Sequence, residues 1–283
     1  MMRRNTWWIA LGVAAILIAL FSLRAPWLSQ KGGEGLITGL STPESVAIGP
    51  DGKYYVSNLG RPGQQGDGTI KVVEAGAVKD LVTGLDDPKG IAIWDGRLYV
   101  ADVDKIWQIS LTGQKELLLG PEGFPRRPLF LNDVAFDSSG NLYVSDTQLG
   151  IIFKVTPERE ATIFADRSMI PELRGPNGLI FDPEGNLLLI DFNTGKLLKI
   201  KPDGSGEVIG ENFGGGDGLA FDREGNLYIS DYKGGKIFKR APNGSIEVIA
   251  QGLKAPADIS IDVKRNLLLV PEFNGNRLRL IKF

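Results

Sequence analysis

The stretch that decides the fold is GDGLAFDREGNLYISD, residues 216–231. A short apolar run is followed by an Asp-Arg-Glu-Gly-Asn turn and then by a run with alternating apolar residues, which is the pattern of a β-hairpin. The pattern occurs five more times, as PESVAIGPDGKYYVSN (43–58), PKGIAIWDGRLYVAD (88–102), LNDVAFDSSGNLYVSD (131–146), PNGLIFDPEGNLLLID (176–191) and PADISIDVKRNLLLVPE (256–272). A repeat of this regularity predicts a fold built from copies of one unit.

Further strands are expected after each hairpin. The quoted stretch is followed by KIFKR (236–240) and EVIAQGL (247–253), and most other units show equivalent runs. Four antiparallel strands in each repeat are typical of propeller blades. The sixth unit ends after three strands, and GLITGL (35–40) is the candidate for its fourth. The sequence therefore predicts an all-β fold, a six-bladed β-propeller over residues 31–283 that an N-terminal strand closes.

Residues 1–30 form a separate segment. Trp7 to Leu23 contains no charge and follows Arg3 and Arg4, which predicts one N-terminal hydrophobic helix. We expect an uncleaved membrane anchor rather than a signal peptide, because Arg24-Ala25-Pro26-Trp27 offers no cleavage site with small residues. The arginines favour a cytoplasmic N-terminus, with the propeller on the extracytoplasmic side, periplasmic or extracellular. If the segment were cleaved, the protein would be secreted.

Two residue types are missing, and their absence limits the chemistry. The chain has 283 residues with no Cys and no His, which excludes disulfides, thiol nucleophiles and every triad that uses histidine. The net charge is −2, and three arginines without an acid in residues 1–30 leave −5 on the rest. Nucleic acid is therefore not an expected partner. Catalysis would depend on carboxylates, amides, Lys, Arg, Tyr, hydroxyls or a hard metal ion.

One polar position recurs just before the innermost strand of each repeat, where the blades of a propeller surround a central channel. Four of the six residues there are oxygen donors that suit Ca²⁺, Mg²⁺ or Mn²⁺. Asn-Gly and Asp-Gly are also common turn sequences, so each residue alone could be a turn former. Four donors in register favour a metal site. The six positions are Glu44, Lys89, Asn132, Asn177, Asp217 and Ala257.

Other repeated positions have simpler explanations. A nearly uniform series ends each second strand, and we expect it to accept backbone hydrogen bonds in the following turn. The series is Asn58, Asp102, Asp146, Asp191, Asp231 and Glu272.

A series of tyrosines within the strands is expected to pack between blades: Tyr55, Tyr99, Tyr143 and Tyr228. Two loops, residues 60–68 and 121–131, are candidates for the channel entrance, with Phe130 and Arg127 of the second as candidate substrate contacts.

The blade starts at Glu44, Leu131-Asn132-Asp133, Pro176-Asn177-Gly178 and Asp217-Gly218 resemble those of the gluconolactonase/regucalcin (SMP-30/LRE-like) family. The resemblance implies a single catalytic cation, Ca²⁺ first, with Mg²⁺, Mn²⁺ or Zn²⁺ as alternatives. It implies that Glu44, Asn177 and Asp217 hold the metal, and that Asn132 is a further ligand or contacts the substrate. Some members hold a sugar with an arginine at the position of Phe130, so the resemblance leaves the substrate open.

The function expected from this resemblance is a membrane-anchored, metal-dependent hydrolase of a small lactone or ester. Asp217 would activate water or attack the carbonyl directly. Lys89 could bind a carboxylate or phosphate of the substrate. The membrane anchor also resembles that of strictosidine-synthase-like propellers, and the repeats resemble NHL-repeat propellers. The alternative is therefore a non-catalytic scaffold or accessory subunit, which would bind a protein partner in a membrane complex.

Overall fold

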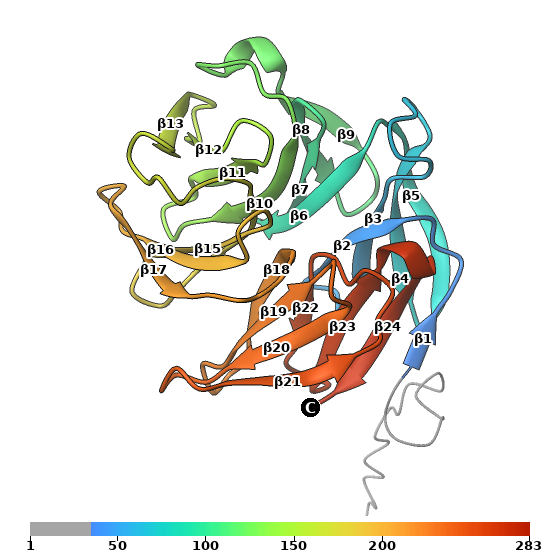
Figure 1. The fold of residues 1–283 in the computed structure, drawn as a ribbon. Coiled ribbons are helices and arrows are strands. Elements are labelled where there is room, and N and C mark those ends of the chain that lie inside the picture. The colour runs from blue at the N-terminus through green and yellow to red at the C-terminus, as the bar shows by residue number, and fades with distance from the viewer. Residues whose placement is uncertain (1–34) are drawn as a thin grey trace, which may run out of the picture.

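The computed structural model describes residues 35–283, and they form six four-stranded antiparallel sheets arranged around a central axis (Figure 1). The predicted six-bladed propeller is therefore confirmed. In the first five blades the four strands follow one another from the inside outwards in chain order. Within residues 35–283 no α-helix is present, and the two 3₁₀ turns are Pro121–Gly123 and Phe273–Gly275.

The strands lie close to the segments that the repeat predicts. Blade 1 contains β2 (Pro43–Ile48), β3 (Tyr54–Asn58), β4 (Gly68–Glu74) and β5 (Ala77–Leu85). Blade 2 contains β6 (Pro88–Trp94), β7 (Arg97–Asp102), β8 (Lys105–Ser110) and β9 (Lys115–Leu119). Blade 3 contains β10 (Leu131–Phe136), β11 (Leu142–Asp146), β12 (Ile151–Val155) and β13 (Ala161–Asp166). Blade 4 contains β14 (Pro176–Phe181), β15 (Leu187–Asp191), β16 (Lys196–Ile200) and β17 (Gly206–Gly210). Blade 5 contains β18 (Gly216–Phe221), β19 (Leu227–Asp231), β20 (Lys236–Arg240) and β21 (Ile246–Gln251).

Blade 6 combines the two ends of the described chain. Its strands are β22 (Ser260–Asp262), β23 (Leu267–Glu272), β24 (Arg277–Lys282) and β1 (Gly35–Ile37). β1 is antiparallel to β24, with Leu36 opposite Arg279 and Ile37 opposite Leu278. Figure 1 shows blue β1 beside red β24. The predicted closing strand is thus confirmed, and the ring leaves no open edge between the first and last blades.

The blades pack through apolar side chains. One cluster joins Tyr55 and Ile70 of blade 1 to Ile91 and Leu98 of blade 2. Another joins Tyr143 of blade 3 to Leu179 of blade 4. Tyr55 and Tyr143 therefore pack between blades as predicted. Because alternate residues of a strand face opposite sides of the sheet, the middle strands contribute to the contacts with both neighbouring blades.

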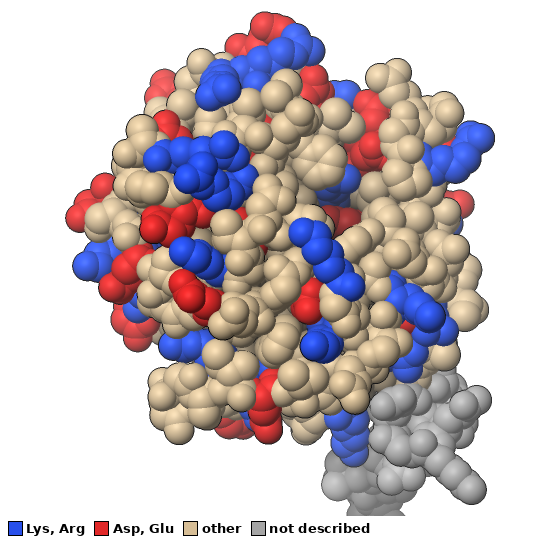
Figure 2. All heavy atoms as spheres, viewed as in Figure 1, with Lys and Arg blue, Asp and Glu red and all other residues tan. Residues whose placement is uncertain are grey.

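The predicted hydrophobic helix lies outside the described residues. The predicted boundary between residues 30 and 31 also lies outside them. Residues 35–283 include no helix that is long and apolar enough to span a bilayer. On the face in Figure 2, Lys and Arg are interspersed with Asp and Glu rather than gathered into a field of one sign.

Candidate functional site

Five of the six predicted channel positions line a single cavity at one mouth of the propeller. Its volume is about 440 Å³, and the five residues are Glu44, Lys89, Asn132, Asn177 and Asp217. The sixth, Ala257, is buried but does not line the cavity. Each of the five comes from a different blade and is second in its innermost strand, β2, β6, β10, β14 or β18. The shared register therefore places distant parts of the sequence together.

A backbone irregularity accompanies each of these residues. The pairing of the two inner strands shifts between Pro43 and Val46 in blade 1, and between Pro176 and Leu179 in blade 4. The same shift occurs at the start of β6, β10 and β18. Irregularities of this kind re-aim side chains and are common beside active sites. Here each one coincides with the residue that faces the cavity.

Asn177 and Asp217 lie in strands, so the interpretation of Asn-Gly and Asp-Gly as turn formers is wrong. The glycines that follow have another role. A Cβ on Gly178 would lie 2.1 Å from the Asp217 carbonyl oxygen, and a Cβ on Gly218 would lie 2.5 Å from Asp258 Cα. Glycine therefore lets neighbouring inner strands approach closely around the channel.

The acidic series at the ends of the second strands fixes the loops that carry the cavity residues. Asp191 Oδ2 accepts hydrogen bonds from the Arg174 and Gly175 amides at 2.7 Å, three and two residues before Asn177. Asp231 Oδ1 likewise accepts one from the Gly215 amide at 2.9 Å, two residues before Asp217. These side chains also accept bonds from the following turn, as predicted. The series is therefore structural and anchors the candidate site.

Four oxygen atoms in this cavity are buried without a hydrogen-bond partner among residues 35–283: Glu44 Oε2, Asn132 Oδ1, Asn177 Oδ1 and Asp217 Oδ1. In the same range two other buried side-chain atoms share this condition, Asp67 Oδ1 and Arg277 Nε. Buried polar atoms without partners are costly and uncommon. Here four such oxygens come from four blades and line one cavity, which is the donor set that a hard divalent cation requires.

The orientation of Asn132 supports this arrangement. Its Nδ2 donates a hydrogen bond to Thr147 Oγ1 at 3.0 Å, which leaves Oδ1 for the cavity. Within residues 35–283 no group of three or more Asp, Glu, His or Cys side chains is placed to hold a metal. A cation here would therefore depend on both amide oxygens as well as on the two carboxylates, with water completing its coordination.

The electrostatics of the site also favour a bound cation. Burial, together with the negative charge of Asp133, raises the pKa of Asp217 to about 8. Burial and the Asp217 charge raise the pKa of Glu44 well above its usual value. The Lys89 charge acts in the opposite direction on both carboxyls. Burial thus disfavours the charged form of both acids. A bound cation would stabilise that form, because an opposite charge nearby lowers the pKa of a carboxyl group.

The predicted substrate contacts separate into two groups. Lys89 and Phe130 line the cavity, and Lys89 Nζ lies 4.6 Å from the centre of the Phe130 ring. Arg127 does not line it, because its guanidinium pairs with Asp104 at 3.2 Å and with Glu122 at 3.1 Å on the exposed surface. Pro62 and Gly63 of the loop at 60–68 reach the cavity, so both predicted entrance loops contribute to it.

Sequence reasoning missed an aromatic wall. Phe192, Tyr232 and Phe273 line the cavity from blades 4, 5 and 6. Their rings meet at an angle, with centroids 5.9 Å apart for Phe192 and Tyr232 and 5.6 Å apart for Tyr232 and Phe273. Each directly follows the acidic residue that ends a second strand. This shared position, one residue after the second strand, could have identified the wall in the sequence. Leu59 and Thr147 occupy the same position in blades 1 and 3 and also line the cavity.

Comparison with known proteins supports the assignment that the blade starts suggest. The profile of the SMP-30/Gluconolactonase/LRE-like region matches residues 67–261, more than half of the chain. The chain belongs to this family. No curated protein matches the sequence.

Solved structures share the family's fold with low sequence identity. A gluconolactonase from Xanthomonas campestris has a TM-score of 0.71 and 19% identity, covering 87% of this chain and 88% of that one. A protein of unknown function from Bacteroides thetaiotaomicron has a TM-score of 0.69 and 17% identity, with coverages of 87% and 71%. Virginiamycin B lyase from Staphylococcus aureus has a TM-score of 0.62 and 15% identity, with coverages of 84% and 79%. At these identities the likeness concerns the fold alone.

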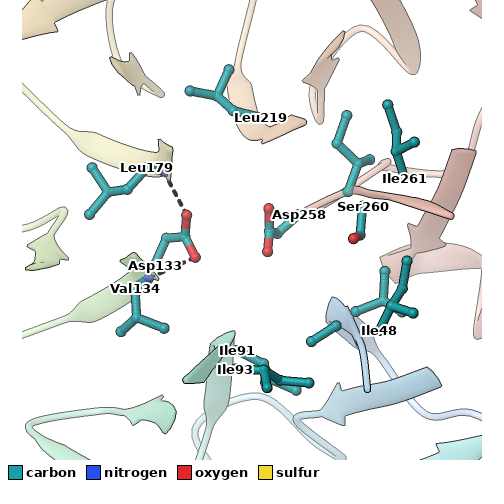
Figure 3. Close-up of a pocket in the computed structure, with 13 residues that line it drawn as sticks. Ile48, Ile91, Ile93, Asp133, Val134, Leu179, Leu219, Asp258, Ser260 and Ile261 are labelled. Carbon is teal, nitrogen blue, oxygen red and sulfur yellow. Dashed lines mark hydrogen bonds between the residues drawn. The ribbon is translucent and has the colours of Figure 1, made fainter. Parts of the chain in front are cut away.

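A second cavity of about 320 Å³ lies along the channel among the inner strands of this family member. Figure 3 shows Asp133 and Asp258 pointing toward each other between apolar side chains that include Leu179 and Ile91. Asp133 Oδ2 accepts a hydrogen bond from the Leu179 amide at 2.6 Å, which ties blade 3 to blade 4. Ser45 Oγ donates to Asp258 Oδ2 at 2.5 Å and ties blade 1 to blade 6. These two acids therefore hold the inner strands together.

Proposed function

We propose that this protein is a divalent-cation-dependent hydrolase of the gluconolactonase-like type that acts on a small lactone or ester. The observation that carries the proposal is the set of four buried oxygens without partners at one mouth of the channel. Family membership and the structural likeness to a gluconolactonase from Xanthomonas campestris support the same reaction class. Oxygen donors of this kind favour Ca²⁺, with Mg²⁺, Mn²⁺ or Zn²⁺ as alternatives.

In this proposal Glu44, Asn132, Asn177 and Asp217 hold the cation. When bound, it would supply Lewis acidity at the substrate carbonyl and stabilise the charge that develops on its oxygen. Asp217 would take the proton of the attacking water, because the cation would keep this buried acid as a carboxylate beside the substrate. Phe130 and the other apolar walls exclude bulk water. Asn132, fixed by Thr147, orients an oxygen toward the reacting group.

Other reaction classes fit the site less well. A catalytically inactive variant of virginiamycin B lyase replaces a histidine with alanine. This chain has no histidine, so a lyase that depends on one is not expected here. A purely structural scaffold would have no use for four unpartnered oxygens in one cavity. A cation-binding propeller that also meets a protein partner at a membrane remains compatible with the proposed hydrolase.

The cellular arrangement belongs to the same proposal. The apolar segment from Trp7 to Leu23 would anchor the chain, and the propeller would lie on the extracytoplasmic side. Small esters or lactones would then reach the cavity without crossing the membrane.

The test uses the full chain, purified in detergent and assayed against a panel of lactones and aryl esters with and without Ca²⁺ or Mn²⁺. We expect turnover that a chelator abolishes and that Glu44→Gln and Asp217→Asn reduce at least ~100-fold. Asp87→Asn is the matched control, because Asp87 also lines the cavity but its carboxylate is already held by the Gly63 amide at 2.9 Å. Turnover that survives chelation or both site variants would overturn the proposal.

A further inference from the structure

Lys89 is a buried residue whose ammonium group opens onto the cavity and has no ion pair within residues 35–283. Its side chain is only 5% exposed, yet it makes no ion pair or hydrogen bond with any residue from 35 to 283. Its Nζ contacts the face of Phe130 at 4.6 Å and lies in the cavity that holds the four oxygen donors. Since an ammonium carries three donors and no residue from 35 to 283 accepts from this one, its donors are available to an acceptor on a ligand in the cavity.

The unused donors of Lys89 point to an anionic ligand. Glu44 and Asp217 as carboxylates balance one divalent cation, and Lys89 and Asp87 are then the other charged residues that line the cavity. Asp87 lines the same cavity, but its carboxylate already accepts the Gly63 amide through both oxygens, at 3.1 and 2.9 Å. A negatively charged group on the ligand would accept hydrogen bonds from the unused donors of Lys89, which no residue from 35 to 283 accepts.

Apart from the Tyr232 hydroxyl, the remaining walls are mostly apolar. Phe192, Tyr232 and Phe273 form the aromatic wall, and Leu59, Pro62 and Phe130 cover further parts of the cavity. The Thr147 hydroxyl is already engaged, because it accepts from Asn132 and donates to the Pro176 carbonyl at 2.7 Å. A polyhydroxylated ligand could place its C–H face on a ring, but its hydroxyls would find few partners. Each buried hydroxyl left unpaired would weaken binding.

We infer that the cavity takes an ester or lactone with an apolar acyl or aryl body and one anionic group, which the Lys89 ammonium binds while Phe192, Tyr232 and Phe273 cover the apolar body. This inference rests on the proposed hydrolase for the identity of the reacting group. It adds the substrate class and gives Lys89 a specificity-determining role. The contact between Lys89 and Phe130 holds the ammonium beside the cation site rather than in bulk water.

Binding of three probes tests the inference without requiring turnover. The full chain, loaded with Ca²⁺ in detergent, is titrated by calorimetry with 3-phenylpropane-1-sulfonate. Two comparison probes separate the charge from the apolar body. The sulfonamide of the same phenylpropane is neutral and keeps the apolar body, whereas 2-hydroxyethanesulfonate keeps the charge and lacks the apolar body. A sulfonate is chosen because it is a weak metal ligand and is not a hydrolysis product. We expect the phenyl sulfonate to bind at least tenfold more tightly than either comparison probe.

Variants assign the two effects to residues. Lys89→Met should remove the advantage of the sulfonate over the sulfonamide, and Phe192→Ala should weaken both phenyl probes while sparing the hydroxyethyl one. Lys115→Met is the matched control, because Lys115 also lies 4.6 Å from an aromatic ring, that of Trp107, but outside the cavity.

Equal binding of sulfonate and sulfonamide, an unchanged ratio in Lys89→Met, or no measurable binding of the phenyl probes would overturn the inference. Loss of turnover alone would not, because the probes report on recognition and the assay of the proposed function reports on hydrolysis.

Discussion

At the residue scale, the site is defined by what its atoms lack. Glu44, Asn132, Asn177 and Asp217 each present a buried oxygen without a partner, whereas the Asn132 nitrogen and the nearby Thr147 hydroxyl are both satisfied. Side chains that merely formed turns would have local partners. The contrast between satisfied and unsatisfied atoms within one cavity is what distinguishes a binding site from ordinary buried polarity.

Replacing Lys89 should change cation affinity in the direction opposite to its effect on the anionic probe. The Lys89 charge lowers the pKa of Glu44 and Asp217, and the same field repels a divalent cation. We expect Lys89→Met to bind Ca²⁺ roughly threefold to tenfold more tightly by calorimetry, with Lys115→Met unchanged. Weaker binding in Lys89→Met would show that the ammonium supports the cation site instead.

The residue register explains why the donors could be predicted from the sequence and the aromatic wall could not. Four oxygen donors in register are improbable by chance. Aromatic residues, by contrast, are ordinary core material, so Phe192, Tyr232 and Phe273 gave no reason to prefer a cavity. Arg127 illustrates the opposite failure. Its loop reaches the entrance, but Asp104 and Glu122 hold the side chain outside, and such pairing partners are invisible in a linear sequence.

At the element scale, each blade places its cavity residue by the same device. An irregular start of the inner strand re-aims the side chain, and the acidic residue at the end of the second strand holds the loop before it. Asp231 anchors Gly215 in this way, and Asp191 anchors Gly175. The repeat predicted the strands and the structural role of this acidic series. It could not show that the anchored loops are those that carry the proposed cation ligands.

Removing one anchor should therefore affect both stability and metal binding. Asp231→Ala leaves the Gly215 and Gly234 amides without their acceptor, which we expect to cost about 3 kcal/mol of unfolding free energy. It should also weaken Ca²⁺ binding, because Asp217 lies two residues after Gly215. Chemical denaturation and calorimetry measure the two effects.

The matched control is Asp203→Ala in an exposed hairpin, where the carboxylate accepts bonds only from Ser205. We expect it to cost less than about 1 kcal/mol and to leave Ca²⁺ affinity unchanged. Equal effects of the two variants on affinity would contradict the anchoring role.

At the scale of the whole molecule, one short strand closes the ring. Ile37 of β1 is 3% exposed and packs with Leu278 and Leu280 of β24, whereas its neighbour Leu36 is 48% exposed. Ile37→Ala should cost about 2–5 kcal/mol of unfolding free energy, and Leu36→Ala less than about 0.5 kcal/mol. Denaturant titrations compare them. Similar small costs for both variants would show that the propeller does not need this closure.

The buried acids predict an unusual dependence of stability on pH. Burial raises the pKa of Asp133 to about 7 and that of Asp217 to about 8, and it also raises the pKa of Glu44 and Asp258. Between pH 5 and 8 the folded metal-free protein therefore holds protons that the unfolded chain has released. Its unfolding free energy should fall as pH rises, by about 1.4 kcal/mol per unit for each such proton.

Saturating Ca²⁺ should flatten this fall, because the cation replaces protons on Glu44 and Asp217. The absence of histidine keeps the pH window free of the side chain that usually titrates there. Thermal unfolding across pH 5–8, with and without Ca²⁺, provides the measurement. Stability of the metal-free protein that rises with pH would contradict the assigned pKa directions.

The central claim is that a cation occupies the mouth of the channel, and its most direct test is anomalous diffraction. Crystals of the full chain grown with Ca²⁺ would be measured at a wavelength where calcium scatters anomalously. We predict one peak about 2.3–2.6 Å from Glu44 Oε2, Asn132 Oδ1, Asn177 Oδ1 and Asp217 Oδ1. A clear map with no peak between these atoms, or with the cation bound elsewhere, would contradict the account.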